Sequence, residues 1–159
     1  MTANHTSLAN YYKGWDNYQE LLSKAIEPLS PDQLALRAAS SLRSIDELAS
    51  HIITARAWWY HGMMREGGSD MEEFYTWDDE GAPAHSAAEL VKGLDLTWNL
   101  MHRCLSRWTA ADLGQTFLTR SYGERSRQWI IWHVIEHDLH HGGELSFTLG
   151  MHGPAAPDL

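Results

Sequence analysis

Residues 129–150 constrain the fold most, because a helical apolar repeat and two histidines share this stretch. It reads WIIWHVIEHDLHHGGELSFTLG, and its apolar residues recur every three or four positions, which indicates a helix. His137 and His141 lie four residues apart within the apolar stripe, the face that an amphipathic helix buries. Side chains four apart are neighbours on one helix face, so two imidazoles can reach one ion at about 2.0–2.1 Å from each nitrogen. A third ligand must then come from another helix.

A second helix with a histidine on its apolar side is predicted from residue 44 to about residue 65. Ser44 and Glu47 have the spacing of a capping box, in which each side chain bonds an otherwise unpaired backbone N–H group. His51 lies about two turns further on, among apolar positions. Taken alone, His51 could be a core histidine satisfied by hydrogen bonds.

The apolar stripes of helices face one another in a helical bundle, so we expect His51 to meet His137 and His141 in the interior. Three imidazoles buried together would be costly without an ion or a polar network to satisfy them. We therefore predict a shared metal ion, with a purely hydrogen-bonded cluster as the alternative.

Two further helices are predicted, over residues 6–29 and 86–107. Proline residues end the first, and a second capping box, Ser86 with Glu89, begins the other. Residues 70–85 are acidic with scattered aromatic residues, which predicts a solvated loop or a lid over the surface.

Residues 114–127 suggest a small hairpin or an irregular crossover around Tyr122 and Gly123, after which Ser126 caps the last helix. The tail from residue 151 is expected to be loose. Together these elements predict an all-α fold, a four-helix bundle with long crossover connections, forming one domain over residues 1–159.

Composition excludes several classes of partner. The chain has 21 acidic and 12 basic residues and a formal charge of −9, which disfavours nucleic acid and anionic membrane surfaces. No apolar run reaches the roughly 18 residues of a membrane span, and the first residues lack the pattern of a secretion signal. Cys104 is the one cysteine, which fits a reducing compartment. We expect a cytoplasmic protein with a small-molecule substrate.

Three segments, KGWDNYQELL, SIDELASHIITARAWW and HVIEHDLHHGGEL, resemble the DinB/YfiT-like superfamily of metal-dependent proteins over nearly the whole chain. The resemblance implies that His51, His137 and His141 bind a divalent metal, and that the protein is a homodimer. Many relatives have arginine and glutamine where this chain has Gly142 and Glu144, so any role of that arginine is not carried over.

Three neutral histidines would leave the ion its full charge and an open position, which is typical of catalytic rather than structural zinc. Zinc is the default ion, and nickel or iron would also suit imidazole ligands. His133 could be a fourth ligand, line a pocket, or pair with an acidic neighbour. Ligating histidines usually donate their other N–H to a carboxylate, carbonyl or water, so the candidates are Glu47, Asp138 and Glu144, each with a solvated face as the default interpretation.

The resemblance implies an S-transferase or isomerase that uses a low-molecular-weight bacterial thiol. Metal-dependent hydrolysis, a non-catalytic module stabilised by its ion, and a helical protein that has lost activity are the alternatives. Three tryptophans could wall a substrate pocket or simply form core: Trp15, Trp58 and Trp59. No catalytic residue beyond the ligands is assigned.

Overall fold

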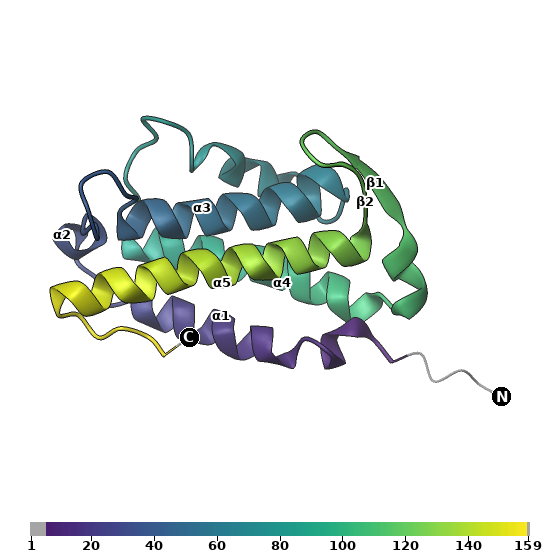
Figure 1. Ribbon diagram of the computed structural model, residues 1–159, viewed down its shortest axis with the longest axis horizontal. Helices are drawn as coiled ribbons and strands as arrows, with labels where there is room; N and C mark the ends of the chain where they lie inside the picture. The colour runs from purple at the N-terminus through teal and green to yellow at the C-terminus, as the bar shows by residue number, and fades with distance from the viewer. Residues whose placement is uncertain (1–5, 159) are drawn as a thin grey trace.

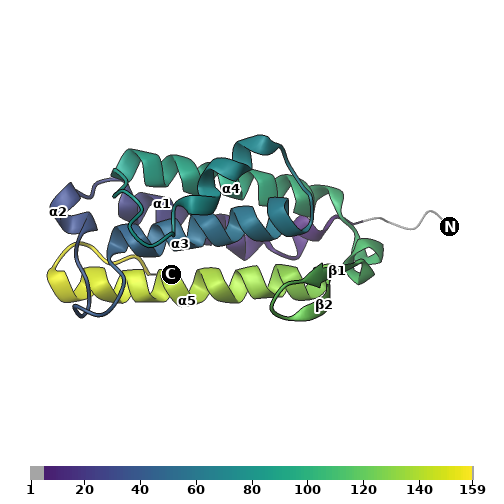
Figure 2. The same cartoon turned by 90° about the horizontal axis from the view of Figure 1, so that it is seen from above.

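The computed structural model describes residues 6–158, and most of this part of the chain is helical. The long helices are α1 (Lys13–Ile26), α3 (Ile45–Ala57), α4 (Ala87–Arg107) and α5 (Arg127–His152). Helix α3 packs against both α4 and α5, and α1 packs against α4. Figures 1 and 2 show these helices side by side, with α3 and α5 as neighbours in both views.

The predicted starts of α3, α4 and α5 are confirmed, because each depends on local hydrogen bonds. Ser44 and Ser86 accept from the backbone three residues on and complete capping boxes with Glu47 and Glu89. Ser126 caps α5 by accepting from the backbone N–H of Trp129. The caps at Ser44 and Ser126 begin the two helices that carry the three histidines.

The first predicted helix is shorter than expected. A 3-10 turn, η1 (Leu8–Asn10), comes first, and α1 begins only at Lys13 because Tyr12 has a non-helical backbone with φ −114° and ψ 25°. The backbone N–H of Leu8 bonds the carbonyl of Trp108 at 2.9 Å, which ties this turn to the end of α4. After α1, a short helix α2 (Pro31–Leu34) leads into the connection to α3.

The connections contain more structure than predicted. A π-helical turn, η2 (Trp58–Met63), extends α3, and a 3-10 helix, η3 (Ser69–Thr76), lies within the predicted loop. Another 3-10 turn, η4 (Ala110–Gly114), precedes two antiparallel strands, β1 (Thr116–Thr119) and β2 (Gly123–Ser126). The predicted hairpin is therefore confirmed, and it adds a two-stranded sheet to a chain predicted as all-α.

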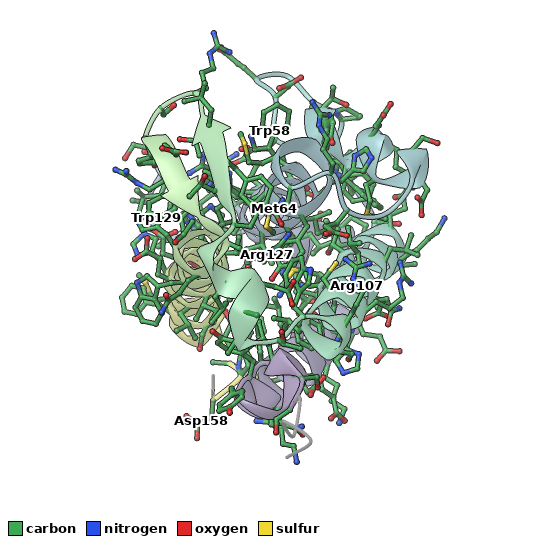
Figure 3. The ribbon with its side chains drawn as sticks, turned by 90° about the vertical axis from the view of Figure 1, so that its right-hand side faces the viewer. Trp58, Met64, Arg107, Arg127, Trp129 and Asp158 are labelled. Carbon is green, nitrogen blue, oxygen red and sulfur yellow. The ribbon has the colours of Figure 1, made fainter. Side chains whose placement is uncertain are left out.

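The hairpin covers one end of the helices, the end that faces the viewer in Figure 3. Gly123 begins β2 with φ +71°, a conformation that glycine adopts without steric cost. Tyr122 in the turn packs against Trp129 of α5, with ring centroids 5.1 Å apart. This end of α5 is thereby closed by aromatic side chains.

A buried ion pair lies inside the apolar core. Arg56 on α3 bonds Asp138 on α5 through both Nε and a terminal nitrogen, the latter at 2.7 Å, and both residues are 0% exposed. Trp15 on α1 donates to the same carboxylate at 2.8 Å. Three helices therefore meet at Asp138, the residue that follows His137.

The tail is held against α5 rather than loose, because the Ser146 hydroxyl donates to the carbonyl of Pro157 at 2.7 Å. Gly153 ends α5 with φ +91°. Within residues 6–158, no helix is long and apolar enough to cross a membrane.

Candidate metal centre

His51, His137 and His141 meet between α3 and α5, as their spacing predicts. The Nε2 atoms of His51 and His137 are 3.0 Å apart, and the three ring centroids are separated by 4.5–4.6 Å. One nitrogen from each ring lies within 4.8 Å of the others. Two nitrogens bound to one tetrahedral zinc would be about 3.3 Å apart. The nitrogen–nitrogen separation of His51 and His137 is therefore close to the separation expected for two ligands of one zinc ion.

Carboxylates orient two of the three rings from the outside. His51 bonds Asp78 through Nδ1, and His141 bonds Glu144 through Nδ1 at 2.7 Å. A carboxylate accepts a hydrogen bond from the Nδ1–H group, which leaves the lone pair of each of these two rings on Nε2, where it can bind an ion. This is the outer arrangement that metal-binding histidines usually have.

The surroundings of His137 favour the neutral ring. Burial, followed by the neighbouring His141 and His51, lowers its pKa from 6.5 to about 3. Burial also lowers the pKa of His141, although Glu144 opposes this shift. Neutral imidazole is the form that ligates a metal.

Hydrogen bonding within the cluster does not satisfy these rings. Among the described residues, the contact between His51 and His137 is the one hydrogen bond between any two of the three rings. Nδ1 of His137 is buried without a partner among the described residues. A cation on the three inward-facing nitrogens fits this donor set better than a hydrogen-bonded cluster does.

A cavity of about 430 Å³ lies next to Glu144, the carboxylate that bonds His141. Leu48 lies one turn before His51, Glu144 holds His141, and both line this cavity with Phe147, Thr148 and residues from the connection before α3. Arg43 lines it as well, and its Nε lies 3.8 Å from the Asp78 carboxylate that orients His51. The cavity therefore adjoins the carboxylate side of the site, at Glu144 and Arg43.

Comparison with known proteins supports the same family as the motifs. The family model described as the DinB superfamily matches residues 15–145. This chain belongs to the DinB superfamily. A crystal structure of a DinB-like protein from Bacillus cereus matches with a TM-score of 0.74 and 19% identity, covering 98% of this chain and 99% of that chain. At this identity the likeness shows the fold. The comparison with curated proteins finds no match.

In this DinB-superfamily chain, His133 does not join the other three histidines. Its ring stacks on Trp129 with centroids 4.8 Å apart and 12° between the planes, and its Nδ1 lies 2.9 Å from Glu136. Trp59 lies against the same ring at 4.9 Å, and Tyr122 at 5.3 Å. His133 is thus part of an aromatic cluster one turn from His137.

The other predicted pocket tryptophans have different places. Trp15 is buried and bonds Asp138, while Trp58 is 45% exposed and packs edge-on against Tyr75. The core interpretation holds for Trp15 and Trp59, which are 7% and 8% exposed.

The three predicted carboxylate partners differ in their roles. Glu144 is confirmed as the neighbour of His141. Glu47 instead accepts from Arg37 and from the backbone N–H of Ser44, the cap of α3. Asp138 is not on a solvated face, because Arg56 and Trp15 hold its carboxylate in the core. The default interpretation of a solvated residue is wrong for Asp138.

Sequence reasoning missed Asp78, which lies in the connection that was predicted as a loop. The stacked rings of Trp77 and His85, with centroids 4.0 Å apart, flank its segment. The backbone N–H of His85 donates to Asp46 on α3 at 3.2 Å, which anchors the segment beside His51. The acidic and aromatic composition of residues 70–85 was the available signal, but it does not identify which carboxylate reaches the histidine.

Proposed function

We propose that this protein binds a divalent metal ion, zinc by default, through His51, His137 and His141. The observation that carries the proposal is the convergence of one nitrogen from each ring to within 4.8 Å, with carboxylates behind two of the rings. Membership of a metal-associated superfamily supports it independently. The four long helices would then form the metal-binding four-helix bundle that the resemblance implies.

The residues around the site have separate tasks in this proposal. Asp78 and Glu144 keep the Nδ1 protons on His51 and His141, so that the Nε2 atoms face inward. The apolar side chains of Leu42, Leu48 and Phe147 line the adjacent cavity and would contact the apolar part of a small-molecule substrate. Solvent reaches the histidine cluster, since the His51 side chain is 21% exposed.

We further propose that the protein is an enzyme of the thiol S-transferase type. Three protein ligands would leave one coordination position of the ion open. A thiol bound at that position would have its pKa lowered by the ion. The thiol sulfur would form a bond to an electrophilic carbon, and the leaving group would depart with the electron pair of its bond. The thiol proton would pass to water. The low-molecular-weight thiol rests on the family resemblance.

Elemental analysis and metal titration test the ligand assignment. His137→Ala and His141→Ala should each lose stoichiometric binding of zinc, while helix content by circular dichroism stays near that of the original protein. His102→Ala is the matched control, because His102 is an exposed histidine on α4 outside the cluster. Full metal content in both cluster variants would contradict the assignment.

The reaction is tested by following electrophile consumption with the zinc-loaded protein, with and without a low-molecular-weight thiol. The proposal predicts a thiol conjugate whose formation requires both the thiol and His137. Consumption of the electrophile without thiol would instead indicate hydrolysis. A zinc-loaded protein that neither conjugates nor hydrolyses across the panel would indicate a non-catalytic module.

We also propose a homodimer, which the resemblance implies. Four large apolar side chains on α5 are exposed, among them Trp132 and Leu139 at 59% and 51%, and Tyr11 before α1 is 72% exposed. Sedimentation velocity should give twice the chain mass, and Trp132→Ser with Leu139→Ser should shift the protein to monomer. A monomeric original protein at high concentration would refute this proposal.

A further inference from the structure

A second group of metal-ligating side chains lies on the outer side of the first. His140, His141 and Glu144 each offer one ligand atom within 4.8 Å of the others. One carboxylate oxygen of Glu144 is 2.7 Å from Nδ1 of His141, and the other is 3.6 Å from Nε2 of His140. Glu144 therefore faces both imidazoles, one with each oxygen.

The helix geometry accounts for this arrangement. His140 and Glu144 are four residues apart and His141 and Glu144 three apart, so all three project from neighbouring positions on α5. Imidazole nitrogen and carboxylate oxygen are both ligands that zinc accepts. The outer side chains are accessible, since those of His140 and Glu144 are 67% and 43% exposed.

His141 takes part in both groups with different atoms. Its Nδ1 faces Glu144, while its ring lies 4.5 Å from those of His51 and His137 on the inner side. An ion on Nδ1 would displace the proton of that nitrogen to solvent, so that His141 would bridge the two ions as an imidazolate, and Glu144 would become a ligand of the outer ion. The hydrogen bond between His141 and Glu144 would then be lost.

We propose that His140 Nε2, His141 Nδ1 and the Glu144 carboxylate form a second, weaker site for a divalent cation such as zinc. The site is weaker because its two outer side chains are mobile in solvent until an ion orders them, and because two cations on opposite sides of one imidazole repel each other. Occupation of this site perturbs the inner one through His141.

This arrangement makes excess metal an inhibitor of the protein. Glu144 orients His141 for the inner ion by bonding its Nδ1. When Glu144 binds the outer ion, this hydrogen bond to His141 is lost. This consequence rests on the proposed catalytic function, whereas the existence of the outer site does not.

Calorimetric titration with Zn²⁺ alone tests the two sites separately. The original protein should bind one ion tightly and a second ion more weakly. His140→Ala should keep the tight ion and lose the second, with at least about a tenfold drop in its affinity. His137→Ala should lose the tight ion and keep the weak one, because its change leaves the outer ligands intact.

His102→Ala is the control for other surface histidines, because His102 lies 3.9 Å from Asp16 and could itself hold zinc weakly. It should still bind two ions. Uptake of a single zinc ion by the original protein at millimolar excess, or an unchanged second ion in His140→Ala, would overturn the outer site. An unchanged tight ion in His137→Ala would instead refute the inner site, so the two failures are distinguishable.

The inhibitory role has its own readout. Thiol-transfer activity of the original protein should fall as zinc exceeds one equivalent, and His140→Ala should resist this fall. Equal inhibition of both proteins would remove the regulatory role while leaving the second site in place.

Discussion

At the scale of single residues, the two carboxylates behind the histidines have unequal surroundings. Glu144 is on the same helix as His141, three residues later, and one face of α5 therefore supplies both. Asp78 comes from a separate segment and is itself close to Arg43 at 3.8 Å. His51 thus depends on a connection between helices for its orientation.

Replacing Asp78 by asparagine tests this dependence. The amide keeps the size of the side chain but loses the charge that holds the Nδ1 proton of His51, so zinc affinity should fall about 10–100-fold. Competition with a chromophoric chelator would measure it. Asp79→Asn is the control, because Asp79 is exposed and adjacent in sequence; equal affinities in the two variants would show that Asp78 does not orient the ligand.

The low pKa of His137 predicts a pH dependence of folding stability for the metal-free protein. Its pKa is about 3 when folded against 6.5 ordinarily, so between these values the unfolded chain binds the additional proton. The free energy of unfolding should therefore fall as pH drops below about 6.5, with a slope of up to about 1.4 kcal/mol per pH unit from this residue.

Urea denaturation at pH 7, 6 and 5 in the presence of a chelator would measure this slope. His137→Gln should have a shallower dependence, because the residue that resists protonation is gone. Parallel curves for the two proteins would mean that His137 is protonated freely in the folded state.

The meeting of His51, His137 and His141 was predictable from the sequence, whereas the carboxylates that bond two of these rings were only partly so. Local sequence patterns predict the helices and their buried faces. His137 and His141 are four residues apart on one such face, and His51 lies on the apolar side of a helix with a recognisable cap. Asp78 reaches His51 across 27 positions, and its segment has no periodicity that would identify the contact. Glu144 was among the predicted carboxylates because α5 itself sets its distance from His141.

At the scale of helices, the pair of Arg56 and Asp138 fixes α3 against α5 next to the cluster. Arg56 also bonds Gln19 of α1 at 2.6 Å, so one guanidinium joins three helices. The hydroxyl of Tyr18 donates to the backbone carbonyl of Asp138, which ties α1 to the same point of α5. The relative position of His51 and His137 depends on these contacts.

Asp138→Asn should destabilise the fold strongly, because it leaves the Arg56 cation buried without its counter-charge. A loss of about 3–5 kcal/mol is expected for breaking a buried pair in this way. Chemical denaturation would measure the loss. Glu20→Gln, in the exposed pair with Lys24, should remain near the original stability; a similar small effect in both variants would mean that the buried pair contributes little.

The helix starts were predictable because Ser44, Ser86 and Ser126 each bond within three residues of themselves. The break before α1 was not, since residues Leu8–Asn10 form a 3-10 turn whose first N–H group bonds the distant carbonyl of Trp108. The buried state of Asp138 was missed for a related reason. Its partners Arg56 and Trp15 lie 82 and 123 positions away in the sequence, so no local pattern predicts these contacts.

At the scale of the whole molecule, we expect the core to fold without the proposed ion. Apolar residues of all four long helices form one buried cluster, whereas the His51 side chain is 21% exposed. Chelation should therefore leave a helical protein with a cooperative unfolding transition, at a lower midpoint set by the lost binding energy. Circular dichroism during heating would measure this, and unfolding on chelation would indicate a structural ion instead.

X-ray absorption at the zinc edge, on protein loaded with one equivalent of zinc, tests the shared ion most directly. We predict a first shell of nitrogen and oxygen atoms near 2.0–2.1 Å, with imidazole scattering from three rings and no sulfur. In His137→Ala, loaded in the same way, the three-ring signal should be absent. A sulfur shell near 2.3 Å, or an identical spectrum from that variant, would contradict the account.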